Sequence, residues 1–284
     1  MAATTAPAPG AAKRRRLSRT AAGGVGPLGL GVAVLWLSVI VLLPLAAITA
    51  RAFDNGISGF IDAIDAPAAL AALQVTVGVS IVVAVINVVM GTLIAWVLVR
   101  DTFPGKSFVN ALIDLPFALP TIVASIVLLS LYGPQSPFDI HLNATRPALV
   151  IALLFVTLPF VVRAVQPVLH EMDQEVEEAA ASLGASNFTI FRKIILPTLA
   201  PAVLSGGGLA FTRAIGEYGS VVLIGGGIPK ETEVASQYIQ KQIEIDRFVN
   251  AAAVSVALLL IAFVVLLLLR LLGSRTARRE EHAA

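Results

Sequence analysis

The sequence lacks cysteine altogether and is poor in charge and in aromatic side chains. Without cysteine, the 284 residues cannot form disulfides, thiolate metal sites or cysteine nucleophiles. Charged residues make up 13% and hydrophobic residues 57% of the chain, whereas soluble domains carry about 25% charge. The three histidines show no metal-ligand spacing, and they are His141, His170 and His282. The composition predicts a polytopic membrane protein without a metal site.

A phosphate-binding loop is also missing. Residues 103–107, FPGKS, match the end of that motif, but the glycine required five residues before the second glycine is replaced by Arg100. No strand is expected before it. We interpret the stretch as a basic turn at the membrane surface. The chain is therefore expected to be no enzyme, and any ATP hydrolysis would need a separate subunit.

Long apolar runs dominate what is present. A transmembrane helix needs about 20 such residues. A disordered basic tail is expected over residues 1–26, a six-span domain over 27–273 and a second tail over 274–284. The first run has no clean cleavage site after it, so we expect a retained span rather than a signal peptide. Pro116 and Pro120 should kink or break the first turns of the third span. The predicted spans are 28–50, 71–99, 110–132, 147–169, 198–224 and 249–272.

The distribution of lysine and arginine predicts the orientation. About 14 of these residues lie in the tails and in one alternate set of loops, and about five in the other set. The rule that basic loops stay inside places both termini in the cytoplasm. The outside loops are then 51–70, 133–146 and 225–248, the last with a short helix over the pore mouth. The polar segment 175–197 is left in the cytoplasm, between spans four and five.

That segment has the pattern of two short helices joined by a tight turn. The first, 175–183, would end at a left-handed Gly184, and Ser186 could cap the second. Pro197 suits the first turn of span five. The small face of Ala179, Ala180 and Ala181 suits packing in a protein groove, although a helix resting on lipid headgroups is the alternative. The expected faces are Val176, Ala179, Ala180 and Leu183, and then Phe188, Phe191 and Ile195.

The same segment resembles the EAA loop of permease subunits of type I ABC importers. The resemblance implies an all-α integral membrane fold of the MetI-like type with six transmembrane helices. It also implies that this loop forms a cytoplasmic coupling helix that docks into a cleft of an ATP-hydrolysing subunit. The matching residues, which would form the ATPase-coupling site, are Glu178, Ala179, Ala180, Gly184, Ile194, Leu196 and Pro197.

Two further stretches resemble the sulfate/thiosulfate permeases, specifically the T-type subunit. They are LPFALPTIVASIVLLSLYG (115–133) and FTRAIGEYGSVVLIGGGIPKETE (211–233). The resemblance implies a multi-pass subunit of the inner or plasma membrane, surrounded by lipid. Its partners would be a W-type sibling permease, two ATP-binding subunits that use ATP and Mg, and an extracytoplasmic sulfate-binding protein. No nucleic acid and no cofactor of its own are expected.

Three other functions stay open at this point. One is a molybdate or tungstate permease of the same class, because those permeases have a GEFG-like stretch that resembles GEYG at residues 216–219. A secondary transporter would need inverted repeats, of which the sequence gives no convincing sign. A membrane scaffold that transports nothing would leave the polar residues inside the spans without a use.

Arg213 and Glu217 are expected to be the only charges well inside a span. They lie one helical turn apart and can pair on one face. The pair either fixes span five against the partner permease or gives positive potential to a passing dianion. Neutral donors for the same translocation pathway would be Thr121, Ser125 and Ser220.

Overall fold

The computed structural model describes residues 27–281, with the side chains of residues 28–271. The predicted basic tail, 1–26, lies outside the described residues. The chain divides into an N-terminal unit, Met1–Ala47, and a main unit, Ile48–Ala284. The described residues contain helices and turns but no strand. This all-helical architecture agrees with the fold class expected from the sequence.

The first apolar run forms helix α1 (Pro27–Leu37), a π-turn (Ser38–Leu42) and α2 (Leu43–Ala52). In the π-turn the Leu43 N–H donates to the Ser38 carbonyl, five residues back. Pro44 follows immediately and has no N–H to donate to the preceding turn. Its missing donor explains why the α-helical hydrogen-bond pattern changes to a π pattern there. Residues 28–52 are long and apolar enough to cross a membrane, as predicted.

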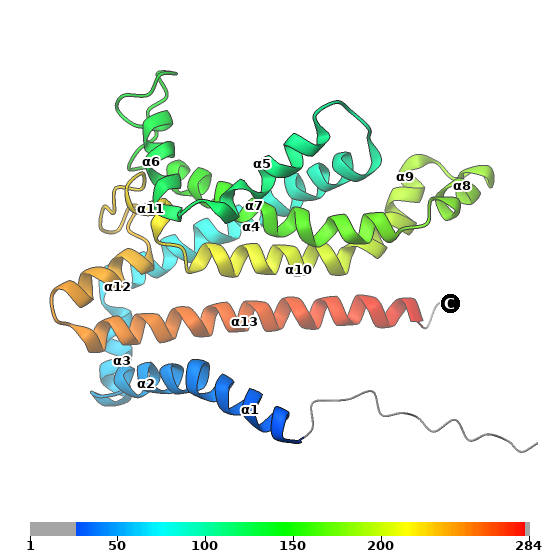
Figure 1. Cartoon of the computed structure of the whole chain (residues 1–284). Helices are drawn as coiled ribbons and strands as arrows, with labels where there is room; N and C mark the ends of the chain where they lie inside the picture. The colour runs from blue at the N-terminus through cyan, green and yellow to red at the C-terminus, as the bar shows by residue number, and fades with distance from the viewer. Residues whose placement is uncertain (1–26, 282–284) are drawn as a thin grey trace, which may run out of the picture. The chain divides into compact units, whose positions relative to one another are not determined.

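The main unit is built from long helices with short ones at both ends. In Figure 1, α8 and α9 lie at one end and α12 at the other, while α4, α7, α10 and α13 run between them. We call Gln174–Ile190 the hairpin end and Gly216–Glu244 the cap end. The helices are α3 (Gly56–Asp65), α4 (Pro67–Arg100), α5 (Lys106–Ala118), α6 (Thr121–Tyr132), α7 (Arg146–Glu171), α8 (Gln174–Ser182), α9 (Asn187–Ile190), α10 (Leu196–Ile215), α11 (Gly219–Val222), α12 (Ala235–Glu244) and α13 (Phe248–Glu281).

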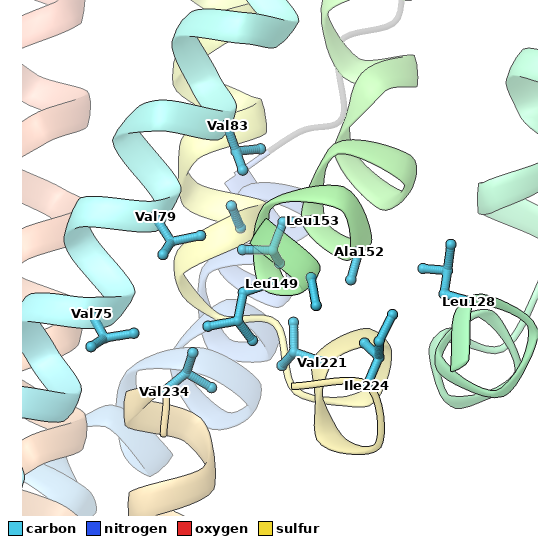
Figure 2. Close-up of a cluster of buried hydrophobic side chains, with 12 residues drawn as sticks. Val75, Val79, Val83, Leu128, Leu149, Ala152, Leu153, Val221, Ile224 and Val234 are labelled. Atoms are coloured by element: carbon cyan, nitrogen blue, oxygen red, sulfur yellow. The ribbon is translucent and has the colours of Figure 1, made fainter. Parts of the chain in front are cut away.

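The core lies where α4, α7 and α10 pack together. Figure 2 shows Val75, Val79 and Val83 of α4 beside Leu149 and Leu153 of α7. Another buried cluster toward the hairpin end joins the same helices to the start of the span-five helix. This packing buries side chains from all around α7, which explains why its apolar window is more buried than those of the other spans.

Glycines allow the three central helices to touch. A Cβ on Gly206 of α10 would lie 2.9 Å from the Ala164 Cβ of α7. A Cβ on Gly207 would lie 2.7 Å from the Val88 side chain of α4. Small residues drive helix association in membranes because backbones can then approach closely. The glycine run in α10 thus sets the spacing of the core.

Buried polar side chains fasten the same helices. The Asn87 amide of α4 donates to the Thr157 hydroxyl of α7 at 2.7 Å, and that hydroxyl donates to the Leu153 carbonyl. Toward the cap end, the Thr76 hydroxyl accepts from the Ala235 N–H at 2.7 Å, which ties α12 to α4. Each bond satisfies a group that would be costly to bury alone.

The third predicted span is broken. Helices α5 and α6 meet at an angle of 114° around Leu119 and Pro120, so the described chain has five long apolar helices, or six if the bent pair counts as one span. The prolines were expected to disturb the first turns, but Pro116 is held inside α5. The break falls at Pro120, where the preceding Leu119 is extended, as the residue before a proline prefers.

The fifth span differs most from its prediction. We expected a helix over 198–224, but one continuous helix runs from Asn187 to Ile215. The chain then turns through Gly216–Tyr218 into the four-residue α11. In the outside loop predicted over 225–248, α12 is the expected short helix. The last apolar span ends at Leu271, while the α13 helix continues to Glu281.

Candidate coupling and translocation sites

Helix α8 and the turn after it have the geometry expected for the first half of the EAA-like segment. The Asp173 side chain accepts from the Glu175 N–H at 2.9 Å and so caps the helix start. At the other end, Gly184 has φ +87° and its N–H donates to the Ala181 carbonyl. The left-handed Gly184 and the helix bounds therefore confirm the local structure predicted for residues 175–184.

The second half departs from its prediction. Ser186 does cap, accepting from the Thr189 N–H, but the helix that it starts is no separate element. It passes through a π-turn, Phe191–Ile195, directly into α10, and the Leu196 N–H donates to the Phe191 carbonyl. Pro197 therefore lies inside a continuous helix, because the π-turn removes the need for its missing N–H. The expected pair of free short helices is wrong in this respect.

Apolar side chains are exposed on both sides of the Gly184 turn. Leu183 is 90% exposed and Phe188 is 70% exposed. On the predicted face, Val176 is also exposed, whereas Ala180 packs toward the core. Large apolar side chains exposed on both sides of a polar turn offer apolar contact area to another molecule. Of the motif residues further along, Ile194 packs against the buried cluster and Leu196 is exposed.

An ion pair fastens the hairpin end to α4. The Arg100 guanidinium, at the last residue of α4, contacts the Glu177 carboxylate of α8. Both side chains are largely buried. The same guanidinium lies 5.3 Å from the centre of the Trp96 ring, which meets the Phe191 ring edge-on at 6.3 Å. The hairpin is thus held by charge and by aromatic packing, and it is not a free loop.

Arg213 and Glu217 do pair, as the spacing predicts. Glu217 lies beyond the end of α10, and its side chain is 1% exposed. Its other carboxylate oxygen accepts from the Ser220 N–H at 2.9 Å, and its backbone carbonyl accepts from the Ser236 hydroxyl. Glu217 therefore joins α10, α11 and α12 and forms an ion pair with Arg213.

The three neutral pathway candidates gather around the same turn. The Ser125 hydroxyl of α6 is fully buried and accepts from the Leu223 and Ile224 N–H groups at 3.2 and 3.3 Å. Thr121, at the start of α6, lies so close to Gly219 that a Cβ there would be 2.1 Å from its hydroxyl oxygen. The Ser220 hydroxyl is buried without a hydrogen-bond partner in the described chain. Thr121, Ser125 and Ser220 thus lie at the α6–α11 contact, and Glu217 links this contact to Arg213.

A second charged pair inside the helices was missed by the sequence analysis. Arg163 of α7 donates to both Asp114 oxygens of α5, at 2.8 and 2.5 Å. Its third nitrogen, Nη1, donates to the side chains of Gln166 and Asn110, and Nη2 donates also to the Asn110 carbonyl. Arg213 and Glu217 are therefore accompanied by a second ion pair on helices of the predicted spans. Arg163 and Asp114 are 49 residues apart, so no local spacing could have linked them.

At the cap end, a buried carboxylate also affects a tyrosine. Glu233, whose side chain is 4% exposed, has the Lys241 ammonium 3.6 Å away. Burial raises the pKa of the Tyr238 hydroxyl above its ordinary value, and the Glu233 charge raises it further. Within residues 27–281, no group of three histidine, aspartate or glutamate side chains is placed to hold a metal ion.

The sequence of the chain is similar to those of known proteins. Residues 87–278 match the profile described as binding-protein-dependent transport system inner membrane component. The chain belongs to this permease family. The permease is 42% identical over 85% of its length to the sulfate transport system permease protein CysT of Synechocystis sp., covering 87% of that protein. It is 39% identical over 89% of its length to the Escherichia coli protein of the same name, covering 94% of it.

Solved structures share the fold of the permease. A bacterial alginate ABC transporter in complex with an alginate pentasaccharide-bound periplasmic protein contains a chain that matches with a TM-score of 0.72 at 16% identity. The match covers 87% of this chain and 92% of that one. A chain of the MetNI methionine ABC transporter matches with a TM-score of 0.53 at 18% identity, over 73% and 94%. The fold is therefore that of type I ABC importer permeases, and the chain is a transport subunit.

Proposed function

We propose that the chain is the T-type permease of an ATP-driven importer of sulfate or thiosulfate. The observation that carries the substrate class is the identity of about two residues in five with sulfate permeases over most of both chains. A second, W-type permease would complete the translocation pathway. Two ATP-binding subunits and an extracytoplasmic sulfate-binding protein would complete the transporter, with ATP and Mg bound by the ATPases.

The hairpin end supports the coupling role. Leu183 and Phe188 are exposed beside a Gly184 whose backbone few other residues adopt without strain. An apolar surface on a short, anchored helix suits a groove on a partner protein. In this proposal the ATPase holds α8, and the Arg100–Glu177 pair passes the movement of α8 to α4. The charge distribution supports a cytoplasmic position for this end and for both termini.

The turn between α10 and α11 supports the pathway role. The Arg213 side chain is 36% exposed although Glu217 is buried, so part of this cationic side chain remains accessible. The buried Ser220 hydroxyl has a free donor. An anion that leaves water needs such donors in place of its hydration shell. Ser125 is better explained as a structural residue, since its hydroxyl already accepts two backbone N–H groups.

Co-expression with the predicted partners tests the assembly and the substrate together. The complex is purified in detergent through a tag on this chain, its subunits are identified, and uptake of radiolabelled sulfate into proteoliposomes is measured. We expect two ATP-binding subunits to co-purify, and uptake to need ATP and to be inhibited by thiosulfate. Inhibition by molybdate alone would identify a molybdate permease instead. Uptake that persists without any ATPase would contradict the proposal.

Arg213→Met tests the pathway role separately. The variant is compared with the wild type in a complex that still assembles and hydrolyses ATP. We expect sulfate uptake to fall while ATPase activity is retained, because the positive side chain at the turn is lost. Full uptake would show that the Arg213–Glu217 pair is only structural.

A further inference from the structure

A cavity of about 430 Å³ opens between α4 and α7, outside the sites described above. Its lining follows α4 from Ala71 to Val82, about 16 Å of helix. Three polar side chains belong to the lining, and they are Gln74, Arg146 and Lys230. The remaining wall is apolar, with Val79, Val82 and Val150 among its members.

The two cations in this lining have no carboxylate partner among the residues that the structure describes. Arg146 donates from Nε to the Glu231 backbone carbonyl at 3.1 Å. That bond orients the guanidinium and leaves its two terminal nitrogens free to donate. Lys230 forms no ion pair within the described chain. Arginine and lysine side chains positioned in this way are the usual donors to oxyanions.

The start of α7 adds to the positive potential. Arg146 is the first residue of this 26-residue helix, and the preceding Thr145 caps it by accepting from the Ala148 N–H. The positive end of the helix dipole therefore lies at the same place as the two cations. By contrast, Arg163 and Arg213 each form an ion pair with a carboxylate.

We propose that this cavity binds a tetrahedral oxyanion, held by Arg146, Lys230 and the Gln74 amide. One source of the oxyanion is the anion carried by the transporter, which would reach this site from the outside, where the charge distribution predicts loop 225–248 to lie. That source rests on the proposed function. The other source is the phosphate of a lipid headgroup, whose acyl chain would lie along Val79 and Val82. Both sources would present the same kind of oxyanion to Arg146 and Lys230.

Acetylation of Lys230 tests this site without a transport measurement. The assembled transporter is treated briefly with acetic anhydride, and modification of Lys230 and Lys241 is quantified by peptide mass spectrometry. Sodium sulfate is compared with sodium chloride at equal ionic strength. Lys241 is the internal control because it lies at the same end but outside the cavity lining. At a sulfate concentration about ten times the dissociation constant, we expect Lys230 modification to slow about tenfold.

Lipid composition separates the two sources. The transporter is placed in nanodiscs of phosphatidylcholine alone or with phosphatidylglycerol. Protection of Lys230 by sulfate in neutral nanodiscs identifies the free anion, and protection only by phosphatidylglycerol identifies the headgroup. Arg146→Gln should abolish either protection, and Gln74→Leu should weaken it without removing a charge. Arg247→Gln, which removes a cation outside the cavity lining, should change nothing.

The outcomes distinguish this site from the proposed function. If neither sulfate nor phosphatidylglycerol protects Lys230 more than Lys241 in a complex that transports sulfate, the oxyanion site is wrong and the function stands. If Lys230 is protected in a complex that moves no sulfate, the site stands and the proposed function is wrong. Protection that survives Arg146→Gln would also overturn the assignment.

Discussion

The two ends of the main unit solve different problems with similar residue types. At the hairpin end, large apolar side chains such as Leu183 and Phe188 are exposed, and the polar anchor from Arg100 to Glu177 lies beneath them. At the cap end, the carboxylates of Glu217 and Glu233 are buried and bonded within the chain. The buried carboxylates of the cap end are satisfied within the chain, whereas the hairpin end exposes apolar side chains that could pack against another protein. Substitutions of these buried carboxylates should therefore affect folding, and substitutions of the exposed apolar residues at the hairpin end should affect association.

The largest effect is expected for Glu217→Ala. This change leaves the Ser220 N–H unpaired and removes the partner of Arg213. We expect the variant to lose about 3 kcal/mol of stability, since the buried Ser220 N–H loses its acceptor and the partly exposed Arg213 loses its partner. Thermal unfolding of the purified complex measures the loss. Glu231→Ala removes an exposed carboxylate from the same end, and equal melting temperatures for both variants would contradict the structural role.

Arg163→Met should have the next largest effect, because it separates α5 from α7. The guanidinium makes bonds to Asp114, Gln166 and Asn110. Both ion-pair partners are partly exposed, at 35% and 48%, so water screens the pair and we expect a loss of about 2 kcal/mol at most. Thermal unfolding again gives the measurement. Arg270→Met, at an exposed arginine without an ion pair in the described chain, should leave the melting temperature unchanged.

Gly184→Val isolates the role of the hairpin end. No atom lies near an added Cβ, so the cost is the left-handed backbone alone, about 1–2 kcal/mol. We expect the hairpin to rearrange, ATPase subunits to co-purify poorly and sulfate uptake to fall about tenfold or more. Gly105→Val is the matched control, with φ +86° and equally open surroundings in a different turn. Equal uptake by the two variants would remove the special role of Gly184.

The smallest effect is expected in the core between the ends. Asn87→Ala and Thr157→Val, alone and together, measure the bond between α4 and α7. Interhelical bonds in membranes contribute about 0.6 kcal/mol on average, so we expect a coupling of that size in the double-mutant cycle. Chemical unfolding in detergent gives the four stabilities. A coupling of zero would show that the bond adds nothing to the glycine-mediated packing.

The sequence was sufficient for the parts of the fold that depend on local chemistry. Apolar length identified the spans, and Gly184 and Ser186 marked the turn and the cap because their backbone and side-chain preferences act within a few residues. It was insufficient where tertiary contacts decide. The apolar run 221–224 resembles the end of a span, yet it forms a separate turn held by Ser125 of α6. The Arg163–Asp114 pair likewise depends on how α5 packs on α7.

The π-turn at Phe191–Ile195 also fixes the direction in which the hairpin end faces. One residue of an α-helix corresponds to about 100° of rotation, so a single residue more or less in this turn re-aims everything on its N-terminal side. A shortening by one position would leave composition, charge and the apolar side chains almost unaltered. It would nevertheless rotate Leu183 and Phe188 by about 100° about the helix axis. The direction in which these apolar side chains face therefore depends on an irregularity in the helix beside Pro197.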